Sequence, residues 1–169
     1  MRKALINNFL NNTDWAHAGR SNLAGDASFR RYIRLTQSGG ERAMLMDAPP
    51  PQEDVRPFIQ IAELLLGLGL SAPRIMAHDA KAGLLLLEDF GDDTYTRLLQ
   101  DGVDELELYQ LATDTLIKLH RSYTPLDSVP PYDDERLLNE AALLVDWYLP
   151  AIRGSKITAN KRDNYLFSI

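Results

Sequence analysis

The hydrophobic periodicity of the chain changes near residue 90, and this change constrains the fold more than any other sequence feature. Before it, short segments such as residues 29–35 alternate apolar and polar side chains, which is typical of half-buried strands. After it, segments such as residues 104–121 carry apolar side chains at three- and four-residue spacing, which is typical of helices. The sequence therefore predicts a sheet-rich part at residues 1–90 and an all-helical part at residues 91–169.

The same patterns predict the individual elements. We expect the sheet-rich part to contain, in order, a helix, three strands, a helix and two strands. Its helices are expected at residues 2–10 and 52–68, and its recognisable strands at residues 29–35, 43–47, 74–78 and 84–88. The helical part is expected to contain helices at residues 104–121 and 133–149, and a third that begins near Thr158 as its N-cap.

Composition restricts the classes of function. The net charge of −6 disfavours general binding to nucleic acid or to an anionic membrane, because both require a cationic field. The sequence has no cysteine, which excludes disulfides and thiolate metal sites, and its three histidines are too scattered to indicate a metal site. We find no targeting signal and no apolar stretch long enough to span a bilayer, so a cytoplasmic location is expected.

A turn with one glycine and one serine precedes the strand at residues 29–35 and is a candidate phosphate-binding element. Its residues are Gly25, Asp26, Ala27 and Ser28. Such a turn can present backbone N–H groups and a hydroxyl to a phosphate group. A single motif with one glycine is also the pattern of an ordinary hairpin turn, and the motif alone leaves both interpretations open.

Several motifs along the chain, taken in order, resemble one known family. They are GDASFRRY at 25–32, MDAPP at 46–50, EDVRPF at 53–58, GLSAPR at 69–74, LLEDFGD at 86–92, LIKLH at 116–120, PPYD at 130–133 and DWYL at 146–149. The set resembles the aminoglycoside-phosphotransferase-like kinases, and within them the bacterial anomeric N-acetylmuramate/N-acetylglucosamine kinases. The resemblance covers essentially the whole chain but only about the N-terminal half of the family's fold.

The resemblance implies a fold and an activity. The implied fold is α+β and protein-kinase-like: a small lobe with an antiparallel five-stranded sheet and a helix, followed by a truncated helical lobe. The implied activity is ATP-dependent phosphorylation of a sugar hydroxyl, with ATP and Mg²⁺ as cofactors and Ser28 and nearby amides over the ATP phosphates. The family's base aspartate, asparagine and metal-binding aspartate are expected beyond residue 169, so we assign no catalytic residue and no metal ligand here. The chain alone is therefore expected to be inactive.

Two features around the expected phosphate site depart from simple expectation. Arg30 and Arg31, with Arg34 beyond them, could bind a phosphate group bidentately or could form a solvated strand edge. Because neighbouring strand residues point to opposite faces, at most one of Arg30 and Arg31 faces the nucleotide.

Kinases carry a lysine on the third strand, and Met46 stands at that position here. In kinases an acid on the following helix pairs with this lysine. Glu53, Asp54 and Glu63 are candidates for that acid here, and each could equally be a solvated helix charge.

The sequence Asp-Phe-Gly at residues 89–91 has the letters of the magnesium-binding motif of protein kinases. That motif follows a base aspartate and, five residues on, an asparagine. The only upstream candidate is Asp79, Leu84 stands five residues beyond it, and no asparagine lies between Asp79 and Asp89. We therefore interpret three residues as a hinge between lobes, whose backbone groups would bind an adenine edge: Glu88, Asp89 and Phe90. A strand that ends in a loop and binds no ligand would have the same geometry.

Two acidic residues, Asp133 and Asp134, are candidates for binding hydroxyl groups of a sugar acceptor, although acids in a first helical turn are usually caps. The expected partners are thus ATP and a small sugar-like molecule, with no nucleic acid and no membrane. A truncated helical lobe would expose apolar surface and favour self-association. The alternative interpretation is a non-catalytic nucleotide-binding or protein-interaction module of kinase-like fold, and Met46 in place of lysine favours it.

Overall fold

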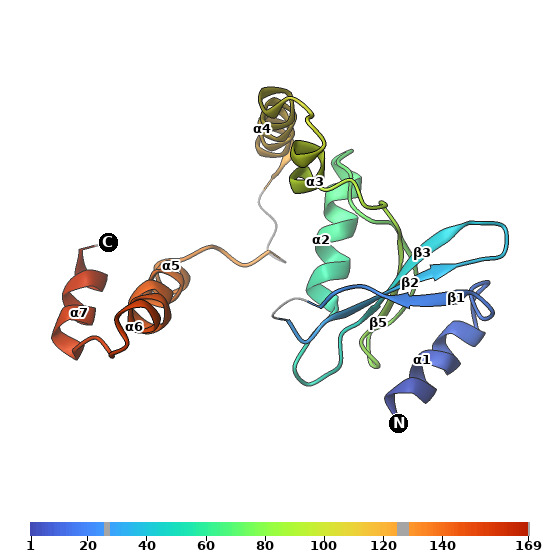
Figure 1. Ribbon diagram of the computed structural model, residues 1–169, viewed down its shortest axis with the longest axis horizontal. Helices are drawn as coiled ribbons and strands as arrows, with labels where there is room; N and C mark the ends of the chain where they lie inside the picture. Colours follow the sequence, from blue (N-terminus) through green and yellow to red (C-terminus); the bar gives the residue numbers. More distant parts are fainter. Residues whose placement is uncertain (26–27, 125–128, 169) are drawn as a thin grey trace. The chain divides into compact units, whose positions relative to one another are not determined.

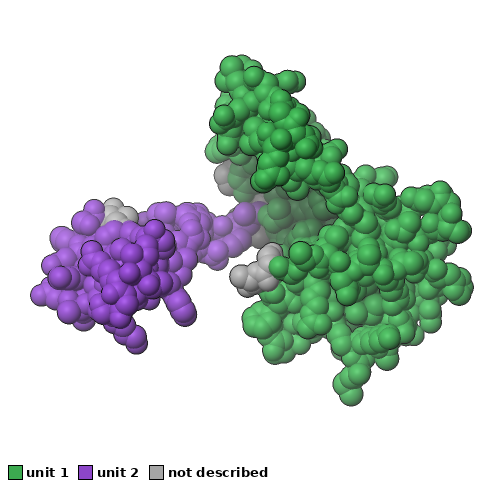
Figure 2. Space-filling view, viewed as in Figure 1, with its two compact units in different colours: residues 1–123 green, residues 124–169 purple. Residues whose placement is uncertain are grey.

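A computed structural model describes residues 1–25, 28–124 and 129–168 of the chain. The chain divides into two compact units, residues 1–123 and residues 124–169 (Figure 2). The change from strands to helices does occur between Glu88 and Tyr95. The compact units divide later in the sequence than residue 90, so the lobe boundary predicted there stays a prediction.

Unit 1 is built on one antiparallel sheet of five strands, in the spatial order β1-β2-β3-β5-β4 (Figure 1). The strands are β1 (Gly19–Asn22), β2 (Arg31–Thr36), β3 (Arg42–Asp47), β4 (Ile75–Asp79) and β5 (Leu84–Glu88). In the register of β3 with β5, Asp47 lies opposite Leu84 and Ala43 lies opposite Glu88. The α+β fold with an antiparallel five-stranded sheet, predicted from the sequence, is confirmed.

One helix packs against each face of the sheet, because the strand side chains alternate between two apolar clusters. Helix α1 (Arg2–Asn11) places Ile6 and Leu10 against Leu35, Leu45 and other side chains of one face. The opposite face packs on Val55 and on helix α2 (Arg56–Gly67); its side chains include Met46, Leu85 and Leu87. We call these the α1 face and the α2 face.

Two expectations about unit 1 needed correction. Strand β1 was not located by alternation, because all four of its residues are exposed and none is a large apolar residue. Helix α2 begins at Arg56 rather than at residue 52, and Pro57 stands in its first turn, where the missing N–H of proline costs no hydrogen bond. After β5 the chain forms a short helix that periodicity does not reveal, α3 (Tyr95–Gln100), and then α4 (Glu105–Ser122).

The turn between β4 and β5 requires glycine at position 83. Its φ is +67°, and a Cβ atom placed on it would lie 2.0 Å from the carbonyl oxygen of Ala48. The carbonyl of Gly83 accepts a hydrogen bond from the Ala48 N–H at 2.9 Å. Only glycine combines this positive φ with so close an approach of two backbones.

Unit 2 is helical and is described by itself. It contains α5 (Asp134–Leu143), a π-helical turn η1 (Leu144–Tyr148), α6 (Leu149–Arg153) and α7 (Ala159–Phe167). Residues 134–148 are therefore helical throughout, as predicted for 133–149, but the hydrogen bonds change from the α to the π pattern after Leu143. Arg162 of α7 pairs with Asp146 of η1 at 2.7 Å. No helix within the described residues is both long enough and apolar enough to cross a membrane.

Candidate functional site

The segment after β5 leaves the sheet at Glu88 and continues without regular structure to Asp93. The N–H of Glu88 still donates to the carbonyl of Arg74 at 2.9 Å, and its carboxylate accepts from the Arg74 guanidinium at 3.1 Å. Those hydrogen bonds from Arg74 hold the pKa of Glu88 below its ordinary value. Phe90, in contrast, is 60% exposed, and its N–H makes no hydrogen bond with any described residue. A backbone donor at the end of a strand is thus available to a ligand.

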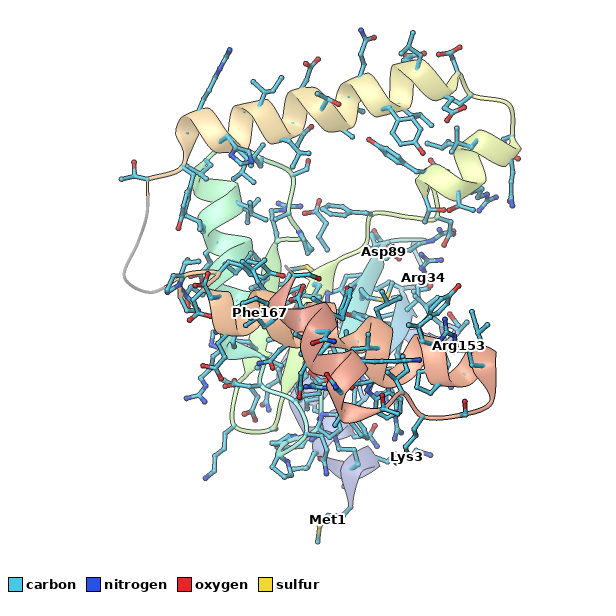
Figure 3. All side chains as sticks on the ribbon, turned by 90° about the vertical axis from the view of Figure 1, so that its left-hand side faces the viewer. Met1, Lys3, Arg34, Asp89, Arg153 and Phe167 are labelled. Atoms are coloured by element: carbon cyan, nitrogen blue, oxygen red, sulfur yellow. The ribbon has the colours of Figure 1, made fainter. Side chains whose placement is uncertain are left out.

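An arginine on the neighbouring strand holds this segment in place. The guanidinium of Arg34, on β2, donates to both carboxylate oxygens of Asp89, at 2.6 and 3.1 Å (Figure 3). It also donates to the carboxylate of Asp92 at 3.0 Å and to the carbonyl of Gly91 at 3.2 Å. The N–H of Gly91 closes the turn by donating to Asp89 at 2.9 Å, and Gly91 has a φ of +82°. We call Arg34, Asp89, Gly91 and Asp92 the hinge clamp.

The hinge clamp accounts for the aspartate of the Asp-Phe-Gly sequence. The side chain of Asp89 is only 2% exposed, and Arg34 and Gly91 satisfy its carboxylate. Burial acts to raise the pKa of Asp89, but the hydrogen bonds from Arg34 and from the Gly91 N–H outweigh it, so the pKa is lowered. The same pairing raises the pKa of Arg34.

The described residues do not fit a magnesium ion. Mg²⁺ prefers several oxygen ligands in octahedral geometry. Within residues 1–25, 28–124 and 129–168 there is no group of three or more His, Asp or Glu side chains that could hold a metal. The one acid that the Asp-Phe-Gly sequence offers is already neutralised by an arginine. We therefore derive no chemical step from a metal held by this chain.

The turn before β2 is tied to the segment before α2. The Ser28 hydroxyl donates to the carboxylate of Glu53 at 3.2 Å, and the Arg30 guanidinium donates to the same carboxylate at 2.9 Å. Hydrogen bonding to Glu53 raises the pKa of Arg30. A Cβ on Gly25 would meet nothing within 4 Å, so the space beside that residue is open. Asp26 and Ala27, also predicted to bind phosphate, lie outside the described residues.

The other residues that the sequence singles out do not lie together at one site. Arg31 belongs to the α1 face, because it alternates with Tyr32, which packs on the α2 face. Met46, which the sequence aligns with the kinase lysine, is fully buried in the apolar cluster of the α2 face. Asp133 and Asp134 belong to unit 2, where Asp133 is the N-cap of α5 and accepts the Arg136 N–H at 3.0 Å.

The sequence does not reveal two contacts at the candidate site. Arg34 is considered there only as one of three arginines near a possible phosphate, yet it binds Asp89 in the segment after β5. Glu53 was considered as an acid of the following helix, yet it binds Ser28 and Arg30 across the turn. Strand alternation does place Arg34 on the face opposite Arg31, but pairing it with Asp89 requires the order of the strands in the sheet.

Comparison with known proteins points to one family. Residues 20–163 match the family model described as "Phosphotransferase enzyme family". The chain is similar to proteins named N-acetylmuramate/N-acetylglucosamine kinase. The one from Pseudomonas aeruginosa is 46% identical over 127 residues, which are 75% of this chain and 36% of the relative. Those from Pseudomonas putida and Caulobacter vibrioides are 39% and 35% identical, over 85% and 86% of this chain and 42% and 50% of the relatives. The chain thus spans half or less of the length of these relatives.

Proposed function

Because the chain belongs to the phosphotransferase enzyme family, we propose that it forms the nucleotide-binding part of an ATP-dependent sugar kinase. The observation that carries this proposal is the clamped segment after β5, which offers the N–H of Phe90 beside an exposed side chain. The names of the relatives support an acceptor of the N-acetylmuramate or N-acetylglucosamine type. We place this activity in the cytoplasm, with ATP and Mg²⁺ as cofactors.

In this proposal each part of the site has one role. The N–H of Phe90 and the carbonyl groups beside it bind the adenine edge, and the hinge clamp fixes the direction of these groups. The turn at residues 25–28 lies over the phosphates, and Ser28 and Arg30 are oriented by Glu53. Asp89 is a structural acid and binds no magnesium, because its carboxylate is already paired with Arg34. Asp133 and Asp134 are proposed to contact the sugar acceptor.

Phosphoryl transfer depends on positioning and on neutralising the charge of the transferred group. The chain supplies the adenine contact and part of the phosphate contact, and the base and the metal ligands are proposed to lie in the part of the relatives that it does not match. A coupled assay with ATP and N-acetylglucosamine should therefore give little or no turnover with this chain. Turnover in the ordinary enzyme range, about 1–1,000 per second, would contradict this division of roles.

The adenine contact can be tested by removing one hydrogen atom. Phe90→Pro deletes the backbone N–H, and Phe90→Ala deletes the exposed side chain while it keeps the N–H. In calorimetric titrations with adenosine, which carries no phosphate, we expect Phe90→Pro to weaken binding about tenfold, the value of one hydrogen bond. Phe90→Ala should bind nearly as the parent does. Thermal melting of both variants checks that the fold is intact.

Two outcomes would decide against the proposal. Equal loss in Phe90→Pro and Phe90→Ala would mean that the side chain, and not the N–H, makes the contact. Absence of adenosine binding in the parent chain would favour the alternative, a protein-interaction module of the same fold. Met46 in place of the kinase lysine is the observation that keeps this alternative in view.

We also propose that the chain self-associates through its helical surfaces. On α4 four large apolar side chains are exposed, and their spacing places them on one side of the helix: Leu106 at 69%, Tyr109 at 53%, Leu116 at 56% and Ile117 at 42%. An exposed apolar side of this kind is usually covered in proteins. Light scattering over a concentration series should show a mass that rises with concentration. A constant monomer mass would refute the proposal.

A further inference from the structure

The α1 face of the sheet carries a cavity whose cations, with the exception of Arg30, have no role in the proposed function. Its volume is about 670 Å³, and it lies between α1, β1 and β2. Five of its lining residues are cationic, with one acid among them; these residues are Arg2, Lys3, Arg20, Arg30, Arg31 and Asp47. The chain as a whole has a net charge of −6, so this local excess of positive charge is opposite in sign to the rest of the protein.

Two of the cations in the cavity are committed to partners. Arg2 donates to the buried carboxylate of Asp47 at 2.7 Å and to the carbonyl of Ala82 at 2.6 Å. The ion pair with Arg2 neutralises the charge of Asp47, the acid of the cavity, whose side chain is only 3% exposed. Arg30 is likewise paired with Glu53 at 2.9 Å.

The other three cations keep their charge available. The side chains of Lys3 and Arg31 form no ion pair and no hydrogen bond with any residue that the structure describes. Arg20 donates to the side-chain oxygen of Asn7 at 2.7 Å, which orients the guanidinium but leaves its charge uncompensated. The apolar side chains of Ile6 and Ile33 also line the cavity, and their low polarity strengthens the attraction of an anion to these cations.

The cavity is separate from the hinge clamp. Arg31 and Ile33 point to the α1 face, whereas Tyr32 packs on the α2 face, and Arg34, two residues further along β2, points to the same face as Tyr32. Along the strands, Arg31 lies opposite Asp47, at the end of the sheet away from Glu88. Lys3 accordingly lies well apart from Arg34 and Asp89 (Figure 3). Gly25 and Ser28 line its rim, so the cavity borders the turn that is proposed to cover the ATP phosphates.

We propose that this cavity is a second anion site, which binds a small phosphate-bearing molecule through Lys3, Arg20 and Arg31 while a nucleotide occupies the hinge. Arg31 has the planar donor geometry that suits a phosphate group, and Lys3 adds a point charge. Arg2 and Asp47 form the rigid wall against which the ligand lies.

The site can be tested with inorganic phosphate as the probe. We would follow backbone amide shifts in ¹⁵N spectra of the full chain during titration, with chloride at matched ionic strength as reference. We expect saturable shifts at Lys3, Arg20 and Arg31. Arg31→Gln should weaken phosphate binding about tenfold, the loss typical of a charged hydrogen bond. Arg121→Gln removes the same charge from α4, outside the cavity, and should change the affinity less than about twofold.

A second titration separates this proposal from the proposed function. Phosphate should still bind in the presence of a saturating non-hydrolysable ATP analogue, and adenosine should bind equally well to Arg31→Gln and to the parent. Displacement of phosphate by the analogue would show that the cavity is part of the nucleotide site, and would overturn the proposal. Equal effects of Arg31→Gln and Arg121→Gln, or shifts that do not saturate, would overturn it as well. Neither result would affect the test of the Phe90 N–H.

Discussion

Removal of the arginine from the hinge clamp should destabilise unit 1 far more than loss of an ordinary surface ion pair. The side chain of Asp89 is 2% exposed. In Arg34→Gln its carboxylate still accepts the hydrogen bond from the Gly91 N–H, but it loses the cation that compensates for its burial. Breaking a buried ion pair from one side costs about 3 kcal/mol. Asp89→Asn removes the negative charge but leaves a hydrogen-bond acceptor, and Arg34 still pairs with the carboxylate of Asp92. We therefore expect a smaller loss of stability, about 1.5 kcal/mol.

The interaction itself is measured by the double variant. Arg34→Gln combined with Asp89→Asn replaces two charges by two neutral amides and should cost less than the sum of the single changes. We expect a coupling free energy of about 2 kcal/mol, inside the range for residues in direct contact. Asp92→Asn is the matched control: the side chain of Asp92 is 48% exposed, so its loss should cost less than about 1 kcal/mol.

The two tryptophans make the assay specific for unit 1. Trp15 is 9% exposed in the core beneath α1, whereas Trp147 is 74% exposed in unit 2. With Trp147 replaced by phenylalanine in every variant, urea unfolding followed by fluorescence reports the free energy of unit 1. Additivity of the two single variants within about 0.5 kcal/mol would refute the reasoning, because it would mean that the contact contributes nothing.

The pH dependence has a definite sign. The pKa of Asp89 is lowered in the folded protein, since the hydrogen bonds from Arg34 and Gly91 outweigh the effect of burial. A lowered pKa adds stability above the pKa of the unfolded chain, and that stability is lost as the pH falls through the folded pKa. The stability difference between the parent and Arg34→Gln should therefore be complete at neutral pH and shrink below about pH 4. A difference that stays constant into acid would argue against an ionic contact.

Three further changes test the packing around the site, each by urea or thermal unfolding. Gly83→Ala should cost about 2 kcal/mol or more, because the new Cβ would lie 2.0 Å from the Ala48 carbonyl oxygen at a φ of +67°; an unchanged melting temperature would show that the turn yields. Met46→Lys, the kinase residue at a fully buried position, should cost about 3 kcal/mol at neutral pH and less at high pH, where the amine is neutral; no loss would reveal an acid within reach. Leu45→Ala, also fully buried, should cost about 3 kcal/mol, and a loss below about 1 kcal/mol would mean that the core collapses around the deletion.

Much of unit 1 could be predicted because its elements carry strong local signals. Alternation in β2, the apolar run of β3 after a turn and the leucines of β5 identify strands whose side chains meet two helices. Strand β1 escaped prediction because an edge strand with four exposed residues has no apolar pattern to detect. The short helix α3 escaped for a related reason: its start depends on a cap, the Thr94 hydroxyl accepting the Arg97 N–H at 3.3 Å, and not on periodicity.

The candidate site was predictable only in outline. Its backbone segment, Glu88 to Phe90, follows from the position between strands and helices. The side chain that holds the segment does not, because Arg34 lies 55 positions before Asp89 and meets it only through the register of three strands. Local sequence equally cannot say that Glu53, rather than a ligand, accepts from Arg30.

The polar outer strand has a consequence for how copies of this chain would meet. An edge of unpaired N–H and C=O groups normally invites another sheet to add to it and to grow into fibres. Here the edge strand β1 reads Gly-Arg-Ser-Asn, so a second copy docking along it would bring arginines together and bury no apolar side chain. We therefore expect no sheet to grow from the β1 edge, and assemblies that form through the helices to be soluble, reversible on dilution and unable to bind thioflavin T.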